Sequence, residues 1–145
     1  MFHSPTAIEP YVMTARTYRV GDLDLVVLEM GRGKPLLVLH EELGCPGPLL
    51  WQADLSKSRK LVVPLHTGFG RTRRLDWVSS VRDLACFYAR FLREQALPPI
   101  DVVGFSFGGW VAAEMAANDP ALSWAQPGMV RSHEGRKTRT GVFQF

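Results

Sequence analysis

The sequence predicts an α/β fold, in which a mainly parallel sheet carries helices on both faces. Three short runs are rich in apolar residues, namely Pro35–Leu39, Leu61–Val63 and Ile100–Phe105, of which only the last contains a charged residue, Asp101. Runs of this kind are typical of parallel strands that are buried on both faces. Segments with helical spacing of apolar residues alternate with them, and this alternation is typical of strands joined by helical crossovers.

The other elements follow in chain order. Residues 16–20 and 23–30 have β-strand composition, and Gly21-Asp22 between them predicts a hairpin turn. A loop rich in glycine and proline precedes a short helix near residues 50–55. Two longer helices are expected later in the chain. The first has Asp76 as its N-cap and runs over residues 78–97, and the second is the alanine-rich segment 107–118.

Charge and composition exclude several classes of protein. Residues 1–128 hold 13 Lys/Arg and 13 Asp/Glu, so the whole net charge of +3 comes from residues 129–145. A nucleic-acid-binding protein is expected to spread its basic residues over a folded face, and this chain does not. The sequence has no apolar run long enough to span a membrane, no signal peptide, and two cysteines without metal-ligand spacing. We therefore expect a cytoplasmic protein with no membrane contact and no metal.

The residues that carry chemistry lie between the strand 100–105 and the helix that follows it. Gly104-Phe105-Ser106-Phe107-Gly108 matches the pattern G-x-S-x-G, and Gly109 comes next. A sharp strand-to-helix turn holds such a serine in a strained conformation above the sheet, and the glycines let strand and helix approach each other. The start of the helix offers the N–H of Phe107 to a developing oxyanion. The pattern predicts that Ser106 is a nucleophile.

With this motif the chain resembles the α/β-hydrolase superfamily, most closely its branch of single-domain esterases and epoxide-hydrolase-like enzymes. The resemblance covers residues 18–120 and rests on four stretches, which are residues 34–40, 64–72, 78–97 and 103–114. It implies a small-molecule substrate and no cofactor. It also implies that the N–H of Glu42, in the loop after the third strand, completes the oxyanion hole. His40 is expected to brace that loop, and His66 and Trp110 are candidate pocket residues.

The chain departs from the family pattern at two places. The loop reads His40-Glu41-Glu42 where the family has glycine second, so a carboxylate lies close to the oxyanion and opposes it. In the family an acid and a histidine follow the serine along the chain, but here His133 is the only later histidine and lies in polar sequence. We therefore expect residues 1–120 to be the N-terminal portion of the domain and residues 121–145 to be a disordered or non-native basic tail. The chain as given is expected to be truncated and weakly active.

Two other classes of function remain open. A nucleotide-binding α/β domain is disfavoured because Ser106 stands where G-x-G-x-x-G needs its second glycine. A non-catalytic fragment that binds a partner through its unfinished sheet is the stronger alternative. If the chain is such a fragment, we expect the strand 100–105 to have an open edge through which the chain self-associates.

Overall fold

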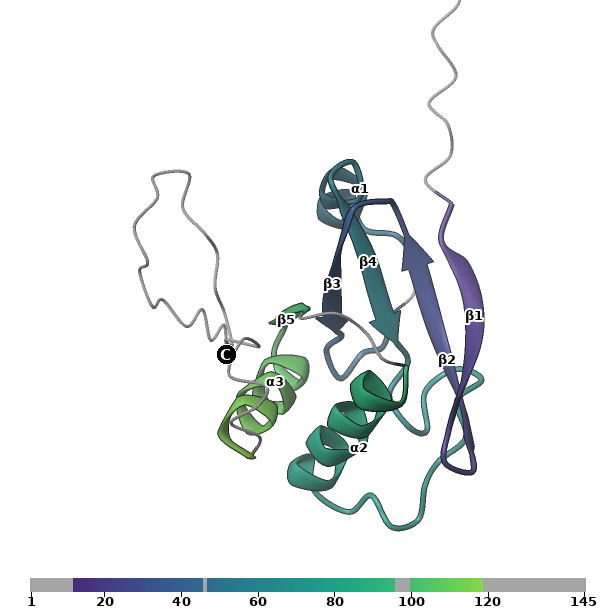
Figure 1. Cartoon of the computed structure of the whole chain (residues 1–145), viewed down its shortest axis with the longest axis vertical. Coiled ribbons are helices and arrows are strands. Elements are labelled where there is room, and N and C mark those ends of the chain that lie inside the picture. Colours follow the sequence, from purple (N-terminus) through teal and green to yellow (C-terminus); the bar gives the residue numbers. More distant parts are fainter. Residues whose placement is uncertain (1–11, 46, 96–99, 119–145) are drawn as a thin grey trace, which may run out of the picture.

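The computed structural model describes residues 12–45, 47–95 and 100–118, which form five strands and three helices (Figure 1). In chain order these are β1 Thr14–Val20, β2 Leu23–Met30, β3 Lys34–Leu39, α1 Leu50–Ser56, β4 Arg59–Pro64, α2 Val81–Glu94, β5 Asp101–Gly104 and α3 Phe107–Asn118. Each strand and helix expected from the sequence is present. The division at residue 120 and the tail 121–145 lie outside the described residues.

The strands form one sheet in the order β1-β2-β4-β3-β5. β3 lies between β4 and β5 and is parallel to both, with Leu37 opposite Val62 on one side and Val102 on the other. β1 and β2 form the expected hairpin, and β2 pairs with β4 in antiparallel fashion. The sheet is therefore mixed, with its parallel part made by the strands that helical crossovers connect. The predicted α/β class is confirmed.

Helices cover both faces of this sheet, as expected. Side chains alternate along β3, so Leu37 and Leu39 join one core cluster while Leu36 and Val38 join another. The first cluster is the larger and includes residues of α2 and α3, which pack side by side (Figure 1). The second contains Ala53 of α1 on the opposite face. Burial on both faces explains why β3 is apolar along its length.

The N-cap of helix α2 lies four residues after the expected one, so the assignment of that role to Asp76 is wrong. Ser80 is the N-cap, and its hydroxyl accepts a hydrogen bond from the N–H of Asp83 at 3.1 Å. The Asp83 carboxylate in turn accepts from the N–H groups of Ser79 and Ser80, both at 3.0 Å. These hydrogen bonds, that of Ser79 first, lower the pKa of Asp83. A reciprocal capping box satisfies more helix-end donors than a single upstream aspartate, and this decides where the helix starts.

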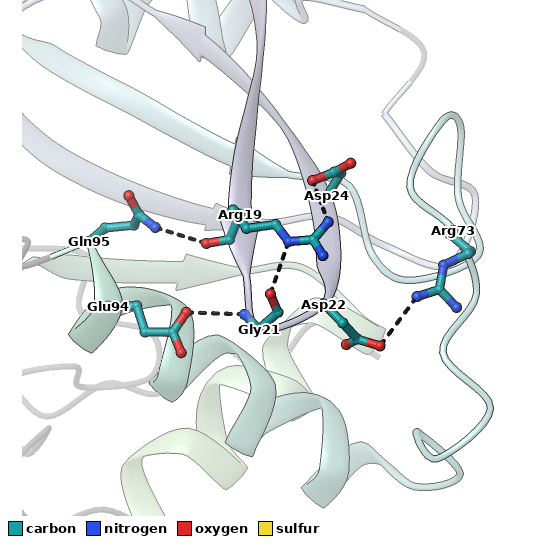
Figure 2. A network of polar contacts seen from close by, with 7 residues as sticks. All are labelled: Arg19, Gly21, Asp22, Asp24, Arg73, Glu94 and Gln95. Atoms are coloured by element: carbon teal, nitrogen blue, oxygen red, sulfur yellow. Dashed lines mark hydrogen bonds and ion pairs between the residues drawn. The ribbon is translucent and has the colours of Figure 1, made fainter.

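The end of α2 is tied to the β1–β2 turn (Figure 2). The Gly21 N–H donates to Glu94 Oε2 at 3.2 Å, and Gln95 donates from its side chain to the Arg19 carbonyl oxygen at 3.3 Å. Arg19 also pairs with Asp24 at 3.0 Å. These contacts are exposed and each contributes little free energy, but together they fix the hairpin against the helix.

Within residues 12–45, 47–95 and 100–118 no helix has the length and apolar character needed to cross a membrane. The same segments contain no group of three or more His, Cys, Asp or Glu side chains that could hold a metal ion.

Candidate active site

Ser106 lies in a sharp turn between the end of β5 and the start of α3. Its backbone φ is +49°, and within the described residues it is the one non-glycine residue with a positive φ. A side chain at positive φ is strained, and such strain persists only where the surrounding structure enforces it. The Ser106 backbone therefore has the conformation of a nucleophile elbow, which the sequence pattern predicted.

The glycines around Ser106 are required by close backbone approach. A Cβ atom on Gly104 would lie 2.2 Å from the carbonyl oxygen of Gly108, and one on Gly108 would lie 2.1 Å from the carbonyl oxygen of Leu39. At Gly109 the nearest contact would be 3.2 Å, from the carbonyl oxygen of Gly104, which is tight but much less severe. Gly104 and Gly108 thus let β3, β5 and α3 meet beneath the serine.

The first turn of α3 leaves the Phe107 N–H free of intrahelical bonds, as at any helix start. This N–H points to the loop after β3, where it donates to Glu42 Oε2 at 3.4 Å. The pKa of this carboxylate is lowered by hydrogen bonding to the Glu42 N–H itself first, then to the Ser106 hydroxyl and the Phe107 N–H. Ser106, the candidate nucleophile, and both predicted oxyanion donors therefore act on one carboxylate.

His40 and His66 brace the loop that carries Glu42. His40 Nδ1 lies 2.7 Å from the Glu41 carbonyl oxygen, and the His66 N–H lies 3.0 Å from His40 Nε2. His66 Nε2 lies 2.8 Å from the His40 carbonyl oxygen, and its Nδ1 lies 2.5 Å from the Tyr88 hydroxyl. A carbonyl oxygen can only accept and a backbone N–H can only donate, so His40 carries its proton on Nδ1 and not on Nε2, and His66 carries a proton on Nε2. The Tyr88 hydroxyl can donate or accept, so the protonation of His66 Nδ1 is decided by the surroundings of the ring.

The environment keeps both rings neutral. Burial, followed by the neighbouring His40, lowers the pKa of His66 to about 4, and burial also lowers the pKa of His40. His66 is only 1% exposed. Its ring nitrogens are both engaged, so His66 supports the loop from below. Tyr88 could not be predicted as the partner of His66, because a tyrosine at helical spacing predicts only burial and not the bond its hydroxyl makes.

A cavity of about 150 Å³ opens between this loop and α1. The rings of Trp51 and Phe105 form one of its walls, with their centroids 4.9 Å apart. His40 lines it, whereas His66 and Trp110 do not, and Trp110 is 57% exposed on α3. The lining residues are Val38, His40, Glu41, Gly44, Cys45, Leu49, Trp51, Gln52 and Phe105. The role of His66 and Trp110 in substrate binding stays a prediction.

Comparison with known proteins agrees with this geometry. Residues 17–141 match the alpha/beta hydrolase family. The chain belongs to this family. The resemblance noted from the motifs is therefore confirmed, together with the partial α/β-hydrolase fold.

Two curated relatives are hydrolases from Pseudomonas. The chain is 28% identical over 112 residues to a 2-hydroxy-6-oxo-2,4-heptadienoate hydrolase of Pseudomonas putida, an alignment that covers 72% of this chain and 40% of the relative. It is 31% identical over 99 residues to a 2-hydroxymuconate semialdehyde hydrolase of a Pseudomonas species, an alignment that covers 63% of this chain and 34% of that relative. The chain thus spans well under half the length of the curated relatives it matches.

A solved structure shows the same fold. The alpha/beta hydrolase fold protein from Chitinophaga pinensis superposes with a TM-score of 0.70 at 22% identity, over 77% of this chain and 42% of that one. At this identity the likeness concerns the fold alone. The five strands and three helices described here therefore correspond to a part of the larger family domain.

Proposed function

We propose that this α/β hydrolase chain is a serine hydrolase that acts on esters or related small molecules through Ser106, without a cofactor or metal. The observation that carries the proposal is the backbone of Ser106, held at φ +49° by glycines that cannot accept a Cβ atom. Strain of this kind at a strand–helix junction is a feature of nucleophilic serines. The curated relatives, which are named as hydrolases of small molecules, support the same class of reaction.

The chemistry follows from the placement of the donors. The Ser106 oxygen attacks the substrate carbonyl carbon, and the carbonyl electron pair moves to oxygen. The N–H groups of Phe107 and Glu42 then stabilise the oxyanion. The alcohol leaves as the oxyanion collapses, and water later cleaves the acyl-serine ester. The proton of Ser106 needs a general base, which in family order follows the serine along the chain. His133, the one histidine after Ser106, lies outside the described residues.

Active-site labelling tests this proposal. The chain is incubated with a fluorophosphonate or an activated ester, and mass spectrometry locates the modified residue. In the chain as given we expect any modification to be weak and to lie on Ser106. In a chain completed with the segment that follows in the family, we expect Ser106→Ala to reduce the rate of ester hydrolysis by about 10³-fold or more. Ser58→Ala is the matched control, because Ser58 is exposed and bonds only weakly, at 3.5 Å, to the Leu55 carbonyl oxygen. Labelling and hydrolysis that persist in Ser106→Ala would remove Ser106 from the mechanism.

A second candidate function is a non-catalytic domain that binds a partner. It is favoured by the position of β5, which pairs with β3 and with no other described strand. An unpaired strand edge can accept a strand from another chain. Absence of any modification at Ser106 in the labelling experiment supports this second function over the first.

A further inference from the structure

The side chain of Glu42 lies where the substrate oxygen of a serine hydrolase has to bind. Its Oε2 atom accepts the hydrogen bond of the Phe107 N–H at 3.4 Å, and Phe107 is the residue directly after the nucleophile. The N–H of Glu42 itself and the Ser106 hydroxyl also favour the charged form of this carboxylate, and all of these donors are neutral groups. The arrangement has the chemistry of an oxyanion hole with a negatively charged oxygen already in it.

A carboxylate is a strong competitor for such donors. A charged acceptor forms hydrogen bonds roughly twice as strong as a neutral carbonyl does. The start of a helix also favours negative charge through its dipole. An ester carbonyl in its ground state therefore competes poorly with Glu42 for these N–H groups, although a fully developed oxyanion competes better.

We propose that the Glu42 side chain is an internal inhibitor, which occupies the oxyanion site in the resting protein and has to swing out before a substrate carbonyl can enter. This inference rests on the proposed function of Ser106. Displacement is feasible because Glu42 is exposed, as is the neighbouring Leu43 at 83%. Water can solvate the released carboxylate. The same residue thus contributes a backbone donor to catalysis and a side chain that opposes it.

Anion binding tests the occupied site without any catalysis. The ¹⁵N-labelled chain is titrated with acetate at pH 7, and the Phe107 amide resonance is followed by NMR. We expect a saturable shift in Glu42→Ala and in Glu42→Gln, and none in the unmodified chain over the same concentrations. Asp54→Ala is the matched control, because Asp54 is also an exposed carboxylate but lies on α1 and does not line the cavity. It should behave as the unmodified chain does. Equal acetate binding by the unmodified chain and Glu42→Ala, or no binding by either, overturns the proposal.

Reaction of Ser106 gives a second readout. We expect Glu42→Ala to speed fluorophosphonate labelling of Ser106 by about tenfold, as removal of one charge-assisted hydrogen bond implies. With an ester substrate the gain should appear mainly as a lower KM. Slower labelling in Glu42→Ala would mean that the carboxylate assists Ser106, and the inhibitor proposal would be wrong. If Ser106 is labelled in none of the variants, the proposed function fails, while the acetate titration still decides the role of Glu42.

Discussion

His40 and His66 are joined by two hydrogen bonds, both donated by His66. The His66 N–H donates to the ring of His40 at 3.0 Å, and the His66 ring lies 2.8 Å from the His40 carbonyl oxygen. The two rings also lie against each other, tilted by 38° and with centroids 3.7 Å apart. This pair joins the loop after β3, which carries Glu42, to the loop after β4. Since His40 has to be neutral to accept the bond from the His66 N–H, we expect this link between the two loops to depend on pH.

Acid should destabilise the protein through His66. The folded state holds the pKa of His66 at about 4, below its ordinary 6.5, so the unfolded state binds the proton more readily between these values. The contribution of His66 is fully present above pH 6.5 and is lost as pH falls towards 4. We expect the free energy of unfolding to fall by about 2 kcal/mol between pH 7 and pH 5. Urea denaturation at a series of pH values measures this.

The matched variant for that measurement is His66→Gln. Glutamine does not titrate, so the variant should be less stable at pH 7 but should lose most of the pH dependence. A smaller dependence of the free energy of unfolding on pH should remain, because burial also lowers the pKa of His40. An unchanged slope in His66→Gln would show that other groups are responsible.

Tyr88→Phe should destabilise the protein although it removes a single oxygen atom. Tyr88 is fully buried, and its hydroxyl donates to Nδ1 of the buried His66. Phenylalanine leaves that nitrogen without a donor, which costs about 1–3 kcal/mol. Thermal denaturation of Tyr18→Phe provides the comparison, since Tyr18 is half-buried and its hydroxyl bonds to Glu29 near the sheet edge. We expect Tyr18→Phe to lose less stability than Tyr88→Phe, and equal losses of stability would contradict the prediction.

Gly108→Ala should destabilise the protein much more than Gly109→Ala does, although the two residues are adjacent. The new methyl group at Gly108 would lie 2.1 Å from a backbone oxygen of β3, whereas at Gly109 the nearest atom would be 3.2 Å away. The backbone of β3 cannot move aside without disturbing the sheet. We therefore expect Gly108→Ala to lower the free energy of unfolding by about 3 kcal/mol and to abolish labelling of Ser106. Gly109→Ala should stay within about 1 kcal/mol, because alanine is the better helix former. Chemical denaturation and labelling on both variants decide this.

We expect the chain to self-associate through the β5 edge and the surface of α3 next to it. Trp110 is 57% exposed on α3, whereas Met115 of the same helix is buried. Trp110→Ser should therefore shift size-exclusion elution towards the monomer. Trp77→Ser is the control, because Trp77 is 53% exposed but precedes α2. Monomeric elution of the unmodified chain at every concentration would exclude this edge as an interface.

Much of the fold could be predicted because the information is local. Runs rich in apolar residues predicted the strands β3, β4 and β5, and the pattern from Gly104 to Gly108 predicted the turn around Ser106. The start of α2 could not be placed, since Asp76 and Ser80 are both good cap residues. Which of the two is the N-cap depends on whether a residue three positions later completes a capping box, and Asp83 does so for Ser80.

The sequence by itself determined the α/β class and the position of the candidate nucleophile, because strand and helix periodicity and the glycine spacing are properties of neighbouring residues. Only the tertiary structure decided what surrounds Ser106. It directed the Glu42 side chain to the Phe107 N–H, 65 residues away along the chain, and it buried His66 against Tyr88. Hydrogen bonds between loops depend on how the sheet brings the ends of β3, β4 and β5 to one edge. No local pattern encodes that convergence.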